Sequence, residues 1–243
     1  MVLLKPQLKE KILQLINENR SLNQIVKETQ VGKTTIYYYM KKIKGVKLIP
    51  INFDFSNIER IGEVIGFFAG DGQYCHFGES YDWRIRFFFN EKEIKVINYY
   101  KDRIEQLINK KTTLISGQSV KILQVHSKKF CDFILSYVKF GLKKTRTIEL
   151  KRKILLTNRN FTKGFLKGLI DSDGYVRKGR REIYFGSVSN KLIKDFIKGL
   201  SLFSLNYKLY VQKRNGYLDF YKVRLANDEV DRFINIIQPI KAI

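Results

Sequence analysis

The chain has 243 residues, of which 46 are Lys or Arg and 23 are Asp or Glu, so its formal net charge at pH 7 is +23. A hydrophobic content of 44% excludes a disordered chain, and the length leaves room for one or two domains with a substantial core. The positive charge exceeds what solubility needs and predicts a polyanionic partner. Aromatic residues, at 14% and interleaved with the bases, favour nucleic acid over a membrane surface.

The N-terminal residues and the scarcity of Cys and His exclude other classes. The chain starts Met-Val-Leu-Leu-Lys-Pro without a long apolar region, and no apolar run reaches the roughly 20 residues of a membrane-spanning helix. We therefore expect an intracellular protein of the cytoplasm, nucleoid or an organelle that is neither secreted nor bound to a membrane. Cys75, Cys131, His76 and His126 lack the spacing of a zinc site and are interpreted as packing residues.

Residues 1–45 are predicted to form a separate all-α unit. Apolar spacing indicates helices over 8–19, 22–29 and 33–44, with a turn at Gly32 before the third. This pattern predicts a helix-turn-helix, whose second helix enters the major groove of DNA. The alternative is a three-helix cap with solvated lysines. The candidate DNA contacts are Lys33, Thr34, Thr35, Tyr37, Tyr38 and Lys41.

After a linker over 46–57, one motif occurs twice. The first copy, over 64–72, is VIGFFAGDG, and the second, over 166–174, is LKGLIDSDG. Each copy is an apolar helical run that ends on an acid followed by Gly. The two final acids, Asp71 and Asp173, lie 102 positions apart.

This motif predicts two helices packed together. Gly66 and Gly168 remove side chains where the helix backbones could approach closely, and Gly72 and Gly174 are natural helix C-caps. Such packing would place the two acids together at the negative ends of two helix dipoles, where they repel each other unless a cation lies between them. Oxygen ligands of this kind suit Mg²⁺. The alternative is that each acid is a solvated helix end.

Both motifs resemble the LAGLIDADG signature of homing endonucleases, with Asp71 and Asp173 at its second acidic position. Asp171 matches the first acidic position, which is Ala69 in copy one. The resemblance implies a DNA endonuclease that uses Mg²⁺, with Mn²⁺ able to replace it, and that cuts each strand once across the minor groove to leave short 3′ overhangs. The ligands it implies are Asp71, Asp173 and the backbone carbonyls of Gly70 and Ser172.

From residue 58 onward the chain repeats itself at a nearly constant offset of 99 to 102 positions, which indicates an internal duplication. Strand-like runs over 83–89 and 182–188 follow the motifs, and helices are expected over 91–109 and 190–203. Each repeat thus has the αββαββα order of a LAGLIDADG half, and two halves in one chain resemble the family's pseudo-symmetric monomers. The predicted fold class is α+β, with halves over 58–142 and 157–243 and between them a basic linker over 143–156. The linker is interpreted as a solvated helix, and the alternative is a helix that also contacts phosphate.

Alternation along the strands predicts which sheet face meets DNA. In the first of these strands Ile85, Phe87 and Phe89 share one face, and two arginines share the other. In the second repeat Phe185 aligns with Arg86, which leaves a bulge open there. Two such sheets would form a basic saddle for the major groove, unless their polar faces are only solvated. The predicted contacts are Arg84, Arg86, Gln124, Arg177, Arg180, Arg181, Lys208, Tyr210, Gln212, Arg214, Lys222 and Arg224.

The resemblance also implies a lysine near the scissile phosphate. Lys128 and Lys178 are the candidates, and Asn90 and Ser189 are polar neighbours that could position water. Because Asp228 stands at the second-repeat position equivalent to Lys128, we expect the two strands to be cut at unequal rates.

Two other functions stay open at this point. Some transcription regulators combine a degenerate LAGLIDADG core with a helix-turn-helix, and some family members are maturases that bind intron RNA. Both acids are present here, and the helix-turn-helix precedes the core, the reverse of the regulator arrangement. We therefore prefer an endonuclease, encoded by an intron or intein, that acts as a monomer on double-stranded DNA with a long pseudo-palindromic site. Its own intron RNA is a second candidate partner.

Overall fold

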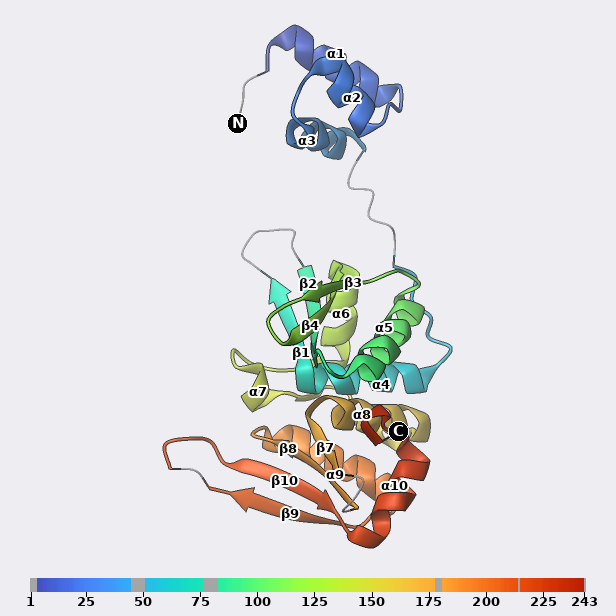
Figure 1. Ribbon diagram of the computed structural model, residues 1–243, viewed down its shortest axis with the longest axis vertical. Helices are drawn as coiled ribbons and strands as arrows, with labels where there is room; N and C mark the ends of the chain where they lie inside the picture. The colour runs from blue at the N-terminus through green and yellow to red at the C-terminus, as the bar shows by residue number, and fades with distance from the viewer. Residues whose placement is uncertain (1–3, 45–50, 77–82, 178–180, 214, 243) are drawn as a thin grey trace. The chain divides into compact units, whose positions relative to one another are not determined.

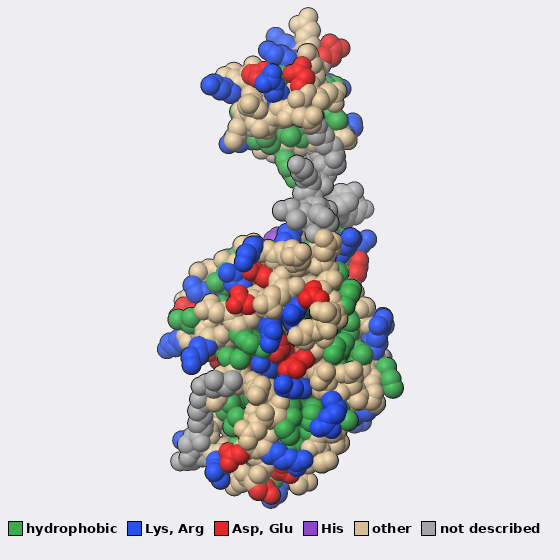
Figure 2. All heavy atoms as spheres, turned by 90° about the vertical axis from the view of Figure 1, so that its right-hand side faces the viewer, with side chains coloured by type: hydrophobic (Ala, Val, Ile, Leu, Met, Phe, Trp, Pro, Cys, Tyr) green, Lys and Arg blue, Asp and Glu red, His purple; other side chains and the backbone are tan. Residues whose placement is uncertain are grey.

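The computed structural model describes residues 4–44, 51–76, 83–177, 181–213 and 215–242 (Figure 1). The chain divides into two compact units, Met1–Pro50 and Ile51–Ile243. Lys and Arg side chains are spread over both units in the view of Figure 2, with Asp and Glu side chains between them. Among the described residues no helix has the length and apolar character needed to cross a membrane.

The N-terminal unit consists of three helices around a small core. All three helices contribute to it, through the buried side chains of Ile12, Leu15, Ile16, Ile25 and Ile36. Apolar residues at this spacing form one stripe on each helix, and the stripes can be buried only against one another. The helices are α1 (Pro6–Asn17), α2 (Leu22–Thr29) and α3 (Lys33–Lys44).

Local hydrogen bonds fix the ends of α2. The Ser21 hydroxyl accepts from the Gln24 backbone N–H at 3.4 Å, and the Gln24 side chain accepts from the Ser21 N–H at 2.8 Å, which is a capping box. Gln30 ends the helix in the left-handed conformation, with φ 56°. Gly32 has no positive φ, and a Cβ added there would meet no atom within 4 Å. The turn before α3 therefore does not depend on a glycine.

The larger unit contains two αββαββα halves, as the sequence predicts. Each half has a four-stranded antiparallel sheet, with strand order β1-β2-β4-β3 in half 1 and β7-β8-β10-β9 in half 2. Half 1 comprises α4 (Ile58–Asp71), β1 (Gly72–His76), β2 (Trp83–Asn90), α5 (Ile94–Ile108), β3 (Thr113–Ser116), β4 (Val120–His126) and α6 (Lys128–Tyr137). Half 2 comprises α8 (Arg159–Asp173), β7 (Gly174–Arg177), β8 (Glu182–Ser187), α9 (Asn190–Leu202), β9 (Tyr207–Gln212), β10 (Phe220–Leu225), η3 (Asn227–Glu229) and α10 (Val230–Ile237), followed by η4 (Ile240–Ala242).

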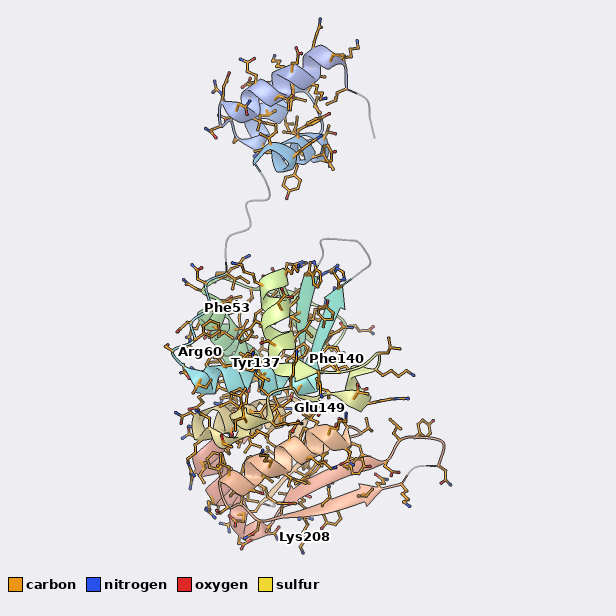
Figure 3. The ribbon with its side chains drawn as sticks, turned by 180° about the vertical axis from the view of Figure 1, so that it is seen from behind. Phe53, Arg60, Tyr137, Phe140, Glu149 and Lys208 are labelled. Carbon is orange, nitrogen blue, oxygen red and sulfur yellow. The ribbon has the colours of Figure 1, made fainter. Side chains whose placement is uncertain are left out.

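The segment between the halves is not the single helix expected, although four of its six bases, Lys143, Arg146, Lys151 and Arg152, are exposed to solvent. Lys153 donates to the Asp195 carboxylate of α9 at 2.5 Å and lies 3.2 Å from Glu149, which ties this partly exposed base to α9. Figure 3 shows Tyr137, Phe140 and Glu149 near the junction of the two halves. The segment contains β5 (Val138–Lys139), α7 (Lys144–Thr147), β6 (Glu149–Leu150) and η1 (Lys153–Thr157), and β5 pairs with β6.

Helices α4 and α8 pack against each other along two stripes of glycine, at the boundary between the halves (Figure 1). A Cβ added at Gly62, Gly66, Gly164 or Gly168 would lie 2.0 to 2.4 Å from a backbone oxygen of the other helix. No side chain fits at that distance, so the close approach predicted at Gly66 and Gly168 is confirmed. It extends one turn further on each helix, to Gly62 and Gly164.

Gly72 and Gly174 end the two helices, but they do not use the left-handed conformation typical of glycine caps. Both are extended, with φ −93° and −79°. A Cβ on Gly72 would instead lie 2.3 to 2.6 Å from atoms of Phe68, and one on Gly174 would lie 2.5 Å from the backbone of Ile170. Because each glycine also begins a strand, the acid before it lies at a sharp helix-to-strand junction.

A buried carboxylate ties α5 to this pair of helices. Glu63 of α4 is fully buried, and its Oε1 accepts from the Tyr99 hydroxyl at 2.6 Å. Lys167 of α8 lies 3.3 Å from the same oxygen, and Arg103 lies 2.9 Å from Oε2. A buried charge needs partners of this kind, so the network fixes α4, α5 and α8 relative to one another.

Candidate functional site

Asp71 and Asp173 lie close together at the C-terminal ends of α4 and α8, as the repeated motif predicts. The backbone of Gly70 lies directly against the other helix, since a Cβ there would lie 2.2 Å from the Ser172 hydroxyl and 3.0 Å from the Asp173 carboxylate. The charge of Asp173 also acts on the Asp71 carboxyl. One acid from each half thus meets the other where both helices end.

Crowding makes this acid pair costly to ionise. Burial, and then the charge of Asp173, raise the pKa of Asp71 to about 6. Desolvation also raises the pKa of Asp173, although its side chain keeps an exposed side, while Lys144 and Lys241 lower it. Two neighbouring carboxylates with raised pKa values are stabilised by any cation placed beside them.

Two lysines, one after the last helix of each half, reach the acids. Lys144 of α7 donates through Nζ to the carbonyls of Ala69 at 2.9 Å and Gly70 at 2.6 Å. Lys241 of η4 donates through Nζ to the Ser172 carbonyl at 2.6 Å. These carbonyls belong to the last turns of α4 and α8, where unpaired C=O groups and the negative dipole end attract cations.

Neither lysine is among the site residues predicted from the sequence. One signal was available: each lies a few residues after the last helix of its half, α6 or α10, at matching points of the repeat. Burial lowers the pKa of Lys144 to about 8, while Asp173 and Asp71 oppose the shift. Lys144 therefore exchanges its proton closer to neutral pH than an ordinary lysine does.

Asp171 holds the segment that carries Lys241. Its side chain is 1% exposed; Oδ1 accepts from the Lys241 backbone N–H at 3.1 Å, and Oδ2 accepts from the Tyr100 hydroxyl of half 1 at 3.0 Å. Burial raises the pKa of Asp171 to about 6. Half 1 has Ala69 at the equivalent position and no carboxylate to play this part.

The donor atoms at this point suit a hard divalent cation. They are two carboxylates and the carbonyls of Gly70 and Ser172, which here accept from the lysine ammonium groups. The described part of the chain contains no group of three or more His, Cys, Asp or Glu side chains placed to hold a metal ion. Mg²⁺ typically binds proteins through one or two carboxylates and keeps waters and substrate phosphate as its other ligands. The residues present therefore fit Mg²⁺ and do not fit a closed structural metal site.

Lys128 does not lie near Asp71 and Asp173, so its prediction as the lysine near the scissile phosphate was wrong. Its Nζ lies over the Trp83 ring, 5.3 Å from the centroid. Trp83 pairs with His76 at the far end of β1, whereas Gly72, next to the acid, begins that strand. Four residues of strand separate the two ends by roughly 13 Å. The other candidate lysine, Lys178, lies outside the described residues.

Of the two polar neighbours, Ser189 differs from expectation, while the role of Asn90 stays a prediction. Ser189 is fully buried, accepts from the Leu192 N–H as the N-cap of α9, and donates to the Ile148 carbonyl at 2.7 Å. A hydroxyl used in this way cannot position a water, so that interpretation of Ser189 was wrong. Asn90 is exposed at the end of β2, where its side chain accepts from the Lys92 N–H at 3.0 Å.

The strand register needs no bulge in half 2. Gly72 pairs with Phe87, and Gly174 pairs with Phe185, so β2 and β8 correspond at an offset of 98. Arg86 is then equivalent to Tyr184. The alignment of Asn90 with Ser189 was one residue out of register, because Ser189 already belongs to the cap of the next helix.

The apolar faces are buried on the inner strands of both sheets but not on the outer strands β3 and β9, where Leu114, Leu209 and Val211 are 42%, 47% and 48% exposed. The opposite faces carry the predicted contacts. Ile85, Phe87 and Phe89 are at most 3% exposed, while Arg84 and Arg86 are partly exposed. Gln124 was predicted as a contact, but it is 5% exposed and its Oε1 accepts from Arg86 Nε at 2.7 Å. Its position therefore orients Arg86 and leaves Gln124 little surface for a partner.

In half 2 most of the predicted contacts are accessible. Arg181 pairs with Asp231 at 3.1 Å, Arg224 lies 3.6 Å from Glu182, and Lys222 Nζ lies 3.6 Å from the centroid of the Tyr184 ring. Figure 3 labels Lys208 on β9, the outer strand of this sheet. Exposed or partly exposed are Arg177, Arg181, Lys208, Tyr210, Gln212, Lys222 and Arg224, whereas Arg180 and Arg214 lie outside the described residues.

The N-terminal unit presents most of its candidate contacts to solvent. Tyr37 and Tyr38 are 52% and 47% exposed on α3, which is unusual for two neighbouring aromatics that would serve only packing. Lys33 and Thr34 are exposed, Thr35 is partly exposed, and the side chain of Lys41 is outside the described part. Their contact with DNA stays a prediction.

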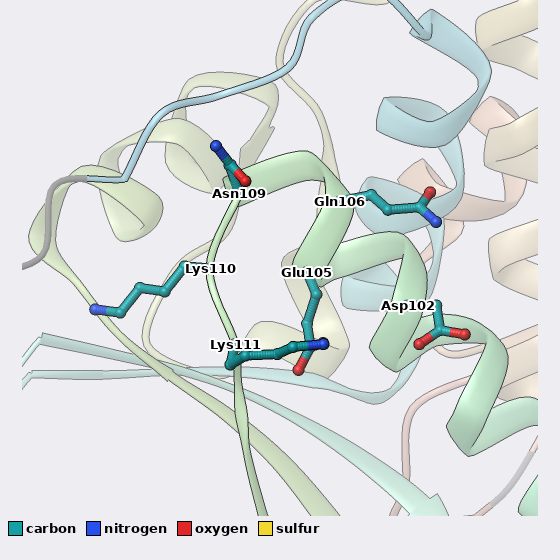
Figure 4. Close-up of a pocket in the computed structure, with 6 residues that line it drawn as sticks. All are labelled: Asp102, Glu105, Gln106, Asn109, Lys110 and Lys111. Carbon is teal, nitrogen blue, oxygen red and sulfur yellow. The ribbon is translucent and has the colours of Figure 1, made fainter.

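A pocket of about 370 Å³ lies at the C-terminal end of α5 (Figure 4). The carboxylate of Glu105 in its wall accepts hydrogen bonds from Lys111 Nζ at 3.0 Å and from the Thr112 backbone N–H at 2.8 Å. Helix α5 starts beside the acids, since Glu93 at its N-cap lies 3.4 Å from Lys241. Its 15 residues span roughly 22 Å, so the pocket is remote from the acid pair.

The model of a LAGLIDADG-like domain matches residues 160–238, which contain nearly all of half 2. The chain has the LAGLIDADG fold. A solved structure of variants of the homing endonuclease I-DmoI superimposes with a TM-score of 0.60 at 16% identity, covering 75% of this chain and 98% of that one. A structure of I-DmoI in complex with DNA and Mn superimposes with a TM-score of 0.59 at 16% identity, covering 74% of this chain and 97% of that one.

Two curated proteins share part of their sequence with this chain. An A-type ATP synthase subunit of Pyrococcus abyssi is 24% identical over 173 residues, which is 70% of this chain and 16% of that protein. A glutamine--fructose-6-phosphate aminotransferase of Methanocaldococcus jannaschii is 21% identical over 181 residues, 73% of this chain and again 16% of that protein. The chain thus spans about a sixth of the length of each.

Proposed function

We propose that the protein is a site-specific double-strand DNA endonuclease of the homing type. It uses Mg²⁺ to hydrolyse one phosphodiester in each strand across the minor groove and leaves short 3′ overhangs. The observation that carries this proposal is the acid pair, Asp71 and Asp173, at the ends of two packed helices with one lysine from each half beside it. A site with two equivalent sets of residues suits a substrate with two equivalent strands.

The residues divide the chemistry between them. Asp71 and Asp173, with the free lone pairs of the Gly70 and Ser172 carbonyls, hold the divalent cation. When bound, such a cation activates water and stabilises the departing 3′ oxygen. Lys144 donates to the oxygens of the phosphate in one strand, and its equivalent in half 2 serves the other.

Double-stranded DNA fits the surfaces around the acids. The chain has a net charge of +23, and the solvent faces of both sheets carry Lys, Arg, Gln and Tyr side chains. Antiparallel strands can lie in a major groove about 12 Å wide, where side chains reach the base edges. Because both acids and both sheets belong to one chain, a monomer suffices for a long pseudo-palindromic site. Such a substrate also places the protein inside the cell.

The N-terminal unit adds a second DNA contact in this proposal. It folds around its own core, and α3 exposes Tyr37, Tyr38 and Lys33 on one surface. A helix-turn-helix with such a helix reads the major groove beyond the site covered by the sheets. The unit then raises affinity by keeping both surfaces on one DNA molecule.

The sequence relatives favour a mobile genetic context. The two enzymes have unrelated activities, yet each matches this chain over 16% of its own length. A shared segment inside otherwise different proteins is what an inserted, self-propagating element predicts. We therefore propose intein or intron mobility as the biological role of the cleavage.

The test is to incubate the protein with a randomised DNA library, with and without Mg²⁺ or Mn²⁺, and to sequence the ends. Asp71→Asn is compared with Asp102→Asn, which changes an exposed acid on α5 away from the site. We expect defined 3′-overhang ends that require the metal, vanish with Asp71→Asn and persist with Asp102→Asn. Tight DNA binding without cuts in either metal would indicate a regulator, and selective binding of intron RNA would indicate a maturase.

A further inference from the structure

The solvent faces of the two sheets differ most in the row of residues nearest the acids. This near row lies one residue beyond Phe87 and Phe185, which pair with the glycines that follow the acids. Cross-strand pairing gives its members. In half 1 they are Phe88, Ile122 and Ile115, and in half 2 they are Gly186, Lys222 and Tyr210.

The near row of half 1 is apolar and open to solvent. Ile115 is 38% exposed, and Phe88 and Ile122 are partly exposed. They alternate with the buried residues Phe87 and Leu123, so they point away from the helices that cover the other face. Apolar side chains grouped on a solvent face, with arginines in the next rows, mark a surface that contacts a partner.

In half 2 the equivalent positions carry polar groups. Lys222 takes the place of Ile122, and Tyr210, which is 46% exposed, takes the place of Ile115. Gly186 is covered by the Phe220 ring, since a Cβ there would lie 2.5 Å from it. Half 2 therefore presents an ammonium group and a hydroxyl where half 1 presents two isoleucines.

These side chains suit different base pairs. In the major groove thymine presents its C5-methyl group, which apolar side chains contact, whereas guanine presents two acceptors that lysine or arginine bind. An isoleucine against guanine would leave those acceptors without a partner, which is unfavourable. On the basis of the proposed function, we propose that half 1 reads thymine methyl groups in the base pairs next to the cleavage centre, and that half 2 reads guanine at the mirrored positions.

The next row of the half 1 sheet, which contains Arg86 and Gln124, supports a thymine contact that is limited to the near row. Arg86 lies one row further from the acids, and Gln124 orients it through a 2.7 Å hydrogen bond from Arg86 Nε. Reading by hydrogen bonds therefore resumes one row further out in half 1. The target predicted for this chain is asymmetric at its centre despite the symmetry of the fold.

The test starts from the DNA site selected by the full-length protein. Deoxyuridine replaces thymidine at single near positions of that site, which removes only the C5-methyl group, and the dissociation constant is measured in Ca²⁺. We expect about fourfold weaker binding for each methyl group removed on the half 1 side, because burial of one such group is worth about 0.8 kcal/mol. At the mirrored positions on the half 2 side, where G·C pairs are expected, the matched control is 5-methylcytosine in place of cytosine, which adds one C5-methyl group and should not strengthen binding.

Two variants assign the half-sites. Lys222→Met should relax the preference for guanine on one side and so identify the half 2 positions. Ile122→Ser should abolish the uracil effect on the other side, and because Ile122 lies on the solvent face, this change leaves the core intact. If wild-type protein shows no uracil effect, or requires guanine or cytosine at the half 1 positions, the thymine proposal fails while the endonuclease proposal stands. A protein that neither binds nor cuts DNA would overturn both.

Discussion

Half 1 and half 2 each place a lysine beside the C-terminal end of their motif helix, α4 or α8, but the two lysines are held in different ways. Lys144 bridges two carbonyls, those of Ala69 and Gly70. Lys241 reaches one carbonyl, and its backbone N–H is held by the Asp171 carboxylate. The first acidic position of the motif therefore has a definite task in half 2, where it fixes a three-residue turn. Half 1 manages without it, because α7 itself brings Lys144 over the end of α4.

The lysines themselves give the largest expected effect. We expect Lys144→Met and Lys241→Met each to slow cleavage by about 10² to 10³-fold, because each removes a donor aimed at charge that develops in the reaction. Nicked DNA should accumulate, cut in opposite strands for the two variants. Single-turnover cleavage of end-labelled DNA measures both rates. Lys128→Met is the control and should cut at the wild-type rate; a large loss there would contradict the assignment of Lys144 and Lys241.

The contact between α4 and α8 should be equally sensitive to substitution of a glycine in either helix. Gly66→Ala and Gly168→Ala each force a methyl group to within 2.4 Å of backbone atoms of the other helix. We expect each to lower the free energy of unfolding by about 2 to 3 kcal/mol, as overpacking of a tight core does. Urea unfolding followed by circular dichroism measures it. Gly32→Ala, with no atom within 4 Å, is the matched control. Equal stability of all three variants would mean that the helices can separate at little cost.

Asp171→Asn tests the different attachment of the two lysines directly. The amide accepts at only one of the two oxygens that now bind Tyr100 and the Lys241 backbone, so the turn should shift without unfolding. We expect about tenfold slower cleavage, since small displacements of a reacting group cost rate. The slowed strand should be the one slowed by Lys241→Met, with DNA affinity unchanged. Equal slowing of both strands would indicate a general loss of structure.

Removing one charge of the acid pair should have a smaller effect than the changes above, and the effect is on the free energy of unfolding. Without metal the pKa of Asp71 in the folded protein is about 6, against an ordinary value of 3.8, so protonation favours the folded state. This contribution is complete below about pH 3.8 and is lost as the pH rises through 6. At pH 7.5 without metal we expect Asp71→Asn to be about 1 kcal/mol more stable than wild type, after discounting for partial exposure. Thermal unfolding at pH 7.5 and 4.5 in chelator measures the difference, which should fall to about a third at pH 4.5, because most of the unfolded chain still has Asp71 ionised at that pH.

Magnesium should reverse the order of stability of wild type and Asp71→Asn. Addition of Mg²⁺ at pH 7.5 is expected to raise the melting temperature of wild type and to leave Asp71→Asn nearly unchanged, because a ligand that binds only the folded state stabilises it. A rise of the same size in both proteins would show that the metal binds elsewhere.

The repeated features of this protein are predictable from local sequence patterns. The acid pair, the αββαββα order and the buried faces of the strands follow from local patterns that occur twice, and the glycines at 66 and 168 predict the close helix contact. Residues 1–45 likewise indicate their three helices through apolar spacing alone. These features are predictable because period and chain direction fix them before any long-range contact forms.

The packing of distant segments determines which lysines lie beside the acids. Lys144 and Lys241 lie 73 and 68 positions after the acids of their own halves, in segments without a repeated motif, and no local pattern reports such a distance. Lys128 and Ser189 were misassigned for the same reason, since one belongs to the far end of a sheet and the other to a helix cap. A catalytic constellation is set by where loops return in space, which depends on the packing of all the elements between them.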